Sequence, residues 1–79
     1  MYIIQNVAGK FYVGHTDDLG QRLHFHNTGQ SHYTARRGPW ALVHSETFDS
    51  RSAAARREGE IKRWKSRPAI ERLIGSAQV

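Results

Sequence analysis

A chain of 79 residues without a single cysteine has to hold its fold together by packing a small number of hydrophobic side chains. A domain of this size buries only roughly 60% of the surface that its unfolded chain exposes, so the core is thin. The absence of cysteine excludes both disulfide bonds and thiolate metal sites as further sources of stability. Because 38% of the residues are hydrophobic, the composition suffices for one small domain that spans residues 1–79.

The sequence contains no candidate for a membrane-spanning segment. A transmembrane helix needs about 20 consecutive apolar residues, and no run in this chain approaches that length. The N-terminal run Met1–Ile4 is too short for a secretion signal and lacks its basic flank. We therefore expect a soluble cytoplasmic protein with no membrane partner.

Positive charge is in excess and unevenly distributed. Twelve Lys and Arg stand against seven Asp and Glu, for a net charge of +5. Eight of these twelve basic residues fall between Arg36 and Lys65: Arg36, Arg37, Arg51, Arg56, Arg57, Lys62, Arg63 and Lys65. Such a field attracts polyanions and speeds their encounter, which favours nucleic acid as the partner. Small basic proteins also use charge for solubility alone.

Two short runs of β-branched and aromatic residues open the chain. Tyr2–Gln5 and Phe11–His15 flank a glycine-containing connection, a pattern typical of a β-hairpin. Alternation in the second run places Tyr12 on the face opposite Phe11 and Val13.

The rest of the chain predicts helices and one more strand. After the hairpin we expect a helix capped by Thr16 or Asp17 that runs to about Asn27, with Gly29 as its stop. The later elements are a strand from Trp40 to Val43 that can extend to Phe48, a helix of about Arg51–Lys65 capped by Asp49 or Ser50, and a short helix Ala69–Ile74 after Pro68. This order predicts a small α/β sandwich in which helices flank a three-stranded antiparallel sheet.

Tyr2 and Tyr12 come from the two strands of the hairpin, which can bring their phenols together. Hydrolysis of a phosphodiester needs a base for the attacking water, a group that holds the phosphate, and a metal or cations that spread the developing charge. A phenol titrates near ~10, so it acts as a base only if its surroundings lower that value or hand on its proton. Tyrosines in strands are also ordinary β-formers with half-buried rings.

Arg22 and His26 lie four residues apart, on one face of the helix that follows the hairpin. A guanidinium group fits two phosphate oxygens at once, and an imidazole can donate to phosphate or shuttle a proton near neutral pH. The alternative is a solvated basic helix face.

Glu58 lies one turn from both Ala54 and Ile61, on the helix stripe that should face the protein. A carboxylate at such a position has to be paired, hydrogen-bonded or bound to metal. A single carboxylate, completed by water and phosphate, is a common ligand set for Mg²⁺. The alternative is an i,i+4 ion pair with Lys62, worth only ~0.3–0.5 kcal/mol on a helix.

The remaining polar residues give weaker indications. His15, His24, His32 and His44 show no pair at metal-ligand spacing on one predicted helix, so we do not expect a zinc site. The basic segment Thr34–Arg37 could grip a nucleic-acid strand, although such loops are usually only solvated. The residues expected to contact nucleic acid are Tyr33, Arg36, Arg37 and Lys62.

Several of these segments stand in a recognisable order. Tyr2-Ile3-Ile4 lies ten positions ahead of Tyr12-Val13-Gly14. The order continues with His15–Leu19, Arg22-Leu23, His26-Asn27, Tyr33–Trp40, Leu42-Val43, Ala54, Glu58, Ile61-Lys62 and Leu73-Ile74. Together they resemble the GIY-YIG nuclease superfamily, and in particular its small single-domain bacterial members.

The resemblance implies a three-stranded sheet flanked by helices and cleavage of nucleic acid that depends on Mg²⁺ or Mn²⁺. It also implies roles for individual residues. Tyr12 matches the active-site tyrosine, Tyr2 its partner from the first motif, Arg22 the phosphate-stabilising arginine, His26 the active-site histidine and Glu58 the metal-binding glutamate. The proton of the attacking water would pass to Tyr12 directly, or through Tyr2 or His26.

We therefore expect a metal-dependent endonuclease that hydrolyses phosphodiester bonds in DNA ahead of RNA, without a small-molecule cofactor. No helix-turn-helix or zinc finger is evident that could read bases, so selection by nucleic-acid structure is expected rather than selection by sequence. One alternative is a catalytically idle module that binds nucleic acid. Another is an interaction protein whose basic face binds an acidic partner, which leaves the tyrosine pair and Glu58 unexplained.

Overall fold

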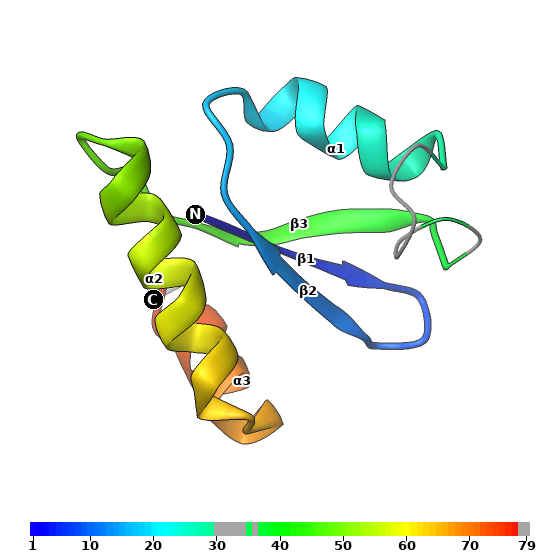
Figure 1. Cartoon of the computed structure of the whole chain (residues 1–79). Helices are drawn as coiled ribbons and strands as arrows, with labels where there is room; N and C mark the ends of the chain where they lie inside the picture. The colour runs from blue at the N-terminus through cyan, green and yellow to red at the C-terminus, as the bar shows by residue number, and fades with distance from the viewer. Residues whose placement is uncertain (30–34, 36, 78–79) are drawn as a thin grey trace.

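Three antiparallel strands in the order β2-β1-β3 form the centre of the fold, with helices on both faces (Figure 1). The computed structural model describes residues 1–29, 35 and 37–77. The elements along the chain are β1 (Tyr2–Asn6), β2 (Phe11–Gly14), α1 (Leu19–Asn27), β3 (Trp40–Ser45), α2 (Arg51–Trp64) and α3 (Arg67–Ala77). The predicted α/β sandwich and its element order are confirmed. None of the described helices is long and apolar enough to cross a membrane.

The central strand β1 pairs with both neighbours, and its register sets which residues face one another. Tyr2 lies opposite Gly14 in β2 and opposite Ser45 in β3. The pairing with β3 shifts by one residue between Ile3 and Ile4, the mark of a β-bulge. Because both neighbours run antiparallel to β1, the first residue of β1 lies at the end of the sheet where β2 and β3 finish.

Each face of the sheet has its own small core, as alternation along the strands requires. On the α2 and α3 face the buried residues are Met1, Ile3, Val13 and Ile61, with Phe11, Val43, Phe48, Ile70, Leu73 and Ile74 packed around them. On the α1 face they are Tyr2, Ile4 and Trp40, with Tyr12 and Leu23 beside them. The predicted placement of Tyr12 opposite Phe11 and Val13 is confirmed.

Asp18 caps α1, so the predicted capping by Thr16 or Asp17 is wrong. The Asp18 carboxylate accepts a hydrogen bond from the Gln21 amide at 3.0 Å. Thr16 instead uses its hydroxyl to accept from the Asp18 amide at 3.2 Å, one step before the helix. At the other end, Gly29 has a φ of 77° and ends the helix as predicted.

The later element boundaries differ from the predictions by a few residues. Strand β3 ends at Ser45 and does not reach Phe48. Of the two predicted caps for α2, Ser50 is the one used, and it accepts from the Ala53 amide at 3.1 Å. Helix α3 is longer than predicted at both ends. At its start, the Ser66 hydroxyl accepts a hydrogen bond from the Ala69 amide, so the helix begins before Pro68.

Candidate active site

Tyr2 and His26 meet in the core beneath α1. The Tyr2 hydroxyl lies 2.8 Å from His26 Nε2, and both side chains are buried. Burial raises the pKa of Tyr2, and the nearby Tyr12 adds to this. Burial lowers the pKa of His26, and the charge of Arg22 adds to this. Near neutral pH the pair is therefore a protonated phenol that can donate its hydrogen to a neutral imidazole.

Gly14, at the end of β2, leaves no room for a side chain. Because Tyr2 lies opposite Gly14 in the register, its phenol passes directly over the Gly14 backbone. A Cβ atom at Gly14 would lie 2.6 Å from the Tyr2 Oη. Any larger residue would displace the Tyr2 ring and with it the hydrogen bond to His26.

Tyr12 extends this cluster toward α2. Its ring centroid lies 4.8 Å from that of His26 and 6.4 Å from that of Tyr2. On the other side, the Lys62 Nζ lies 6.0 Å from the Tyr12 ring centroid, at the outer limit of a cation–π contact. Tyr12 is partly exposed, so it is the tyrosine of the pair that a substrate can reach.

Arg22 lies one turn before His26 on α1 and is partly exposed. Its guanidinium carbon stands 4.9 Å from the Phe25 ring, which holds the side chain over the helix. A surface hollow joins Arg22 to His15 across the β2–α1 connection, with Thr16, Asp18 and Gln21 among its lining residues. Arg22 therefore faces the same side of the molecule as the end of β2.

Glu58 is held between two nitrogen donors. Its Oε2 accepts from Lys62 Nζ at 2.5 Å, and its Oε1 lies 2.5 Å from His15 Nδ1. Partial burial raises the pKa of the Glu58 carboxyl, but the hydrogen bonds from Lys62 and His15 outweigh it and keep the pKa below its ordinary value. The ion pair with Lys62, which the sequence leaves open as the alternative to a metal site, is present, and Glu58 is an ionised carboxylate near neutral pH.

His15 is the contact of Glu58 that the sequence did not indicate. The sequence places it in the segment His15–Leu19 of the family resemblance and indicates no zinc site for it; in the structure it directly follows Gly14 at the end of β2 and points toward α2. The two residues are 43 positions apart, so no helical or strand periodicity could connect them. The only local signal was its place at the end of the strand that carries Tyr12.

The donor set around Glu58 fits a cation that needs few protein ligands. Among residues 1–29, 35 and 37–77, no three His, Asp or Glu side chains converge to form a complete cage. Each carboxylate oxygen has two lone pairs, so the contacts with Lys62 and His15 leave Glu58 able to bind a metal ion. Mg²⁺ tolerates such a site, since water and substrate phosphate commonly complete its coordination shell.

The residues predicted to contact nucleic acid have different outcomes. Lys62 is exposed and lies beside both Glu58 and Tyr12. Arg37 is exposed, and its carbonyl accepts from the Asn6 side chain at 2.9 Å, at the opposite end of β1 from Tyr2. Tyr33 and Arg36 lie outside the described residues.

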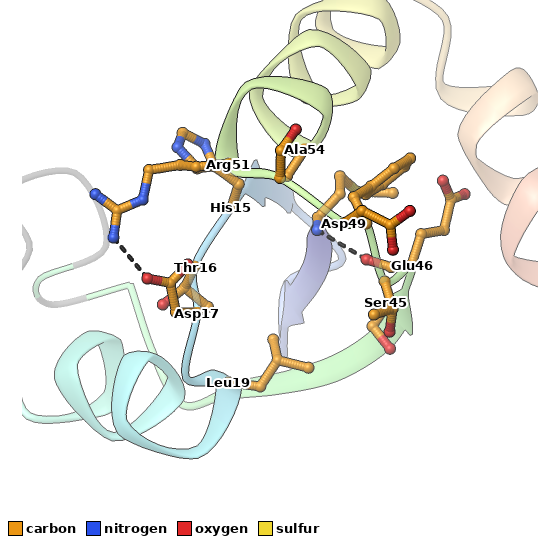
Figure 2. A pocket seen from close by; sticks show the side chains of 13 residues that line it. His15, Thr16, Asp17, Leu19, Ser45, Glu46, Asp49, Arg51 and Ala54 are labelled. Atoms are coloured by element: carbon orange, nitrogen blue, oxygen red, sulfur yellow. Dashed lines mark hydrogen bonds and ion pairs between the residues drawn. The ribbon is translucent and has the colours of Figure 1, made fainter.

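A second set of polar contacts fixes α2 against the sheet (Figure 2). Arg51, in the first turn of α2, donates to Asp17 in the β2–α1 connection at 2.6 Å. The Met1 ammonium group donates to the Glu46 carbonyl at 2.9 Å. The Glu46 carboxylate also accepts from Arg57 in α2 at 2.9 Å. The bonds of Arg51 and Arg57 connect the helix that carries Glu58 to the β2–α1 connection and to the residue that follows β3.

Comparison with known proteins gives one family and several relatives. A family model described as the GIY-YIG catalytic domain matches residues 1–71. A UPF0213 protein of Haloquadratum walsbyi is 45% identical over 65 residues, covering 81% of this chain and 73% of its own. One of Natronomonas pharaonis is 41% identical over 75 residues, covering 94% and 87%. One of Streptococcus pneumoniae serotype 4 is 35% identical over 79 residues, covering 99% and 79%. No solved structure matches the chain.

Proposed function

The chain belongs to the GIY-YIG catalytic domain family, and we propose that it is a divalent-metal-dependent endonuclease. Its substrate is nucleic acid, DNA in preference to RNA, and residues 1–79 act as one domain. The family is one of nucleases.

The convergence of three segments supports this function best. The hairpin supplies Tyr2 and Tyr12, α1 supplies His26, and these three rings lie within 6.4 Å of one another, centroid to centroid. Lys62 lies beside Tyr12 and also binds Glu58, so a continuous chain of contacts joins the aromatic cluster to a carboxylate on α2. A proton-transfer group and an anionic ligand thus lie at the same end of the sheet.

Glu58 is the residue that would hold the metal, since it is an ionised carboxylate that Lys62 connects to Tyr12. A bound Mg²⁺ or Mn²⁺ would neutralise negative charge at the scissile phosphate. Arg22, on the rim of the same face, binds phosphate oxygens through its guanidinium group and stabilises the extra charge of the transition state.

Tyr12 accepts the proton of the attacking water in this proposal, and Tyr2 does not. The Tyr2 hydroxyl is buried, its pKa is raised, and it is engaged with His26. It therefore keeps its proton and orients the imidazole. Tyr12 is partly exposed beside Lys62, so water and substrate can reach its phenol oxygen. That oxygen takes the proton of the attacking water and passes its own hydroxyl proton to solvent. Attack by the water breaks the bond from phosphorus to the departing oxygen, which takes a proton from solvent.

The bonds that Glu58 makes without a metal favour a second candidate function. A carboxylate satisfied by Lys62 and His15 is also what a catalytically idle nucleic-acid-binding module would retain. Such a module would bind nucleic acid in a salt-sensitive way and leave it intact.

Cleavage of labelled single-stranded, duplex and branched DNA and RNA, with Mg²⁺, Mn²⁺ or EDTA, separates the two. We expect cutting that EDTA abolishes and that Tyr12→Phe slows by about 10²- to 10⁴-fold, the usual contribution of a positioned proton acceptor. This variant keeps the ring and its packing. Salt-sensitive binding with no cutting of any substrate would favour the idle module, and cutting at the wild-type rate by Tyr12→Phe would contradict the assigned role.

A further inference from the structure

Lys65 ends α2 in an unusual backbone conformation. Its φ of 47° and ψ of 37° lie in the left-handed region, and within the described residues it is the one non-glycine residue with a positive φ. Glycine, or less often asparagine, normally occupies this position after a helix, because a Cβ atom in the left-handed conformation lies too close to the backbone carbonyl oxygen. Strain of this kind often accompanies a functional requirement for the side chain.

The Lys65 side chain stands at the rim of a hollow between β2, α2 and α3. The floor of this hollow, which we call the Lys65 hollow, is apolar and consists of Phe11, Val13, Ile61 and Ile70, of which Phe11 and Ile70 are partly exposed and the other two are buried. Tyr12 and Lys62 complete its wall, and its volume is about 330 Å³. An apolar floor with ammonium groups at the rim matches a ligand that has a flat apolar part and a negative charge.

The Lys65 hollow is continuous with the proposed active site, because Tyr12 and Lys62 belong to both. Lys62 is already bound to Glu58 at 2.5 Å. Lys65 is exposed, and no carboxylate of the described part of the chain lies within ion-pair distance of it. Its charge is therefore available for an anionic group of a ligand.

We propose that the Lys65 hollow binds an unpaired nucleotide next to the scissile phosphate, with the base on the apolar floor and the phosphate on Lys65. In a duplex the faces of the bases are stacked on one another, so only an unpaired base can lay its face on such a floor. This inference rests on the proposed nuclease function and names its substrate class: single-stranded nucleic acid, or a junction with an unpaired nucleotide at the cut.

Binding to a short single-stranded DNA and to the same sequence as a duplex, both in EDTA, tests the role of Lys65. We expect tighter binding of the single strand. Lys65→Gly should weaken that binding about five- to tenfold at roughly 0.1 M salt and lower the salt dependence by about one ion. Because glycine suits the backbone here, its melting temperature should not fall. Lys65→Arg should bind like wild type, and Arg56→Ala, which removes a charge elsewhere on α2, should lose less affinity.

The methyl signals of isoleucine in NMR spectra report directly on the floor of the hollow. The single strand should shift the Ile70 signal and leave that of Ile4 unchanged, since Ile4 lies on the opposite face of the sheet. The duplex should leave both unchanged. Equal affinity for duplex and single strand, an unmoved Ile70 signal, or unaltered binding by Lys65→Gly would overturn the proposal. Because these readouts need no cleavage, they are independent of whether the chain proves to be a nuclease.

Discussion

Gly14 shows how one residue sets the geometry of the candidate site. With the Tyr2 phenol crossing its backbone, a Cβ atom would lie 2.6 Å from the Tyr2 Oη. We expect Gly14→Ala to lower the free energy of unfolding by about 1–3 kcal/mol, the usual cost of overpacking. Chemical denaturation measures this loss. Gly59→Ala is the control, since its Cβ meets only the flexible end of Arg63 at 3.3 Å and alanine favours a helix by about 1 kcal/mol. Equal stability of the two variants would contradict the steric account.

His26 makes the stability of the protein depend on pH. Burial and Arg22 lower its folded-state pKa below the ordinary 6.5. Below pH 6.5 the imidazole of His26 binds a proton in the unfolded chain but not in the folded chain. The His26 contribution to the free energy of unfolding is therefore complete above pH 6.5 and is lost as the pH falls toward the folded pKa.

Urea denaturation of wild type and His26→Gln at a series of pH values isolates this effect. Both proteins carry the other four histidines, so the difference between their pH profiles reports on His26. We expect the stability advantage of wild type to shrink between pH 6.5 and lower values. An advantage that grows on acidification would show that His26 is charged in the folded state.

Two hydrogen bonds join the end of helix α1 to the start of strand β3. The Asn27 side chain donates to the Trp40 carbonyl at 3.1 Å and accepts from the Trp40 amide at 2.7 Å. These two bonds join the last turn of α1 to the first residue of β3, and so hold the helix that carries Arg22 and His26 on the sheet. The segment in between includes residues outside the described part of the chain.

We expect Asn27→Ala to lower the free energy of unfolding by about 1–3 kcal/mol, because it leaves two backbone groups of Trp40 without this partner. Asn27→Asp keeps an acceptor for the Trp40 amide, so it should lose less. Thermal denaturation of the two variants orders them. If Asn27→Asp lost as much stability as Asn27→Ala, the hydrogen bond from the Trp40 amide would contribute little to stability.

Local signals in the sequence predict most of the helices and strands. Alternation predicted which side of β2 faces which core, and Ser50 and Gly29 marked helix ends correctly. The boundaries that were wrong depend on competition between neighbouring hydroxyl and carboxylate groups. Asp18 rather than Thr16 caps α1 because the Thr16 hydroxyl is occupied by the Asp18 amide.

Some contacts in the folded molecule cannot be predicted from helical or strand periodicity. Tyr2 and His26 are 24 positions apart, and His15 and Glu58 are 43 apart. Helical and strand spacing predict contacts only over a few residues, so these pairs could be assigned only through the family resemblance or not at all. The resemblance indicated Tyr2, Tyr12, Arg22, His26 and Glu58 as a set, and His15 and the Lys65 hollow became evident only in the folded chain.

The variant Glu58→Gln tests whether Glu58 holds the metal of a nucleic-acid cleavage site. Glu58→Gln is close in shape to wild type but removes the negative charge that a divalent ion requires. Glu60→Gln is the matched control, because Glu60 lies on the same helix, is exposed and pairs with Arg57.

The measurement is the single-turnover cleavage rate of the preferred nucleic acid at saturating Mg²⁺. We expect Glu58→Gln to be slower than wild type by about 10³-fold or more, which corresponds to the several kcal/mol that a catalytic metal supplies. Glu60→Gln should stay within about threefold of wild type, since exposed ion pairs contribute little. A Glu58→Gln variant that cuts as fast as the control would contradict the account.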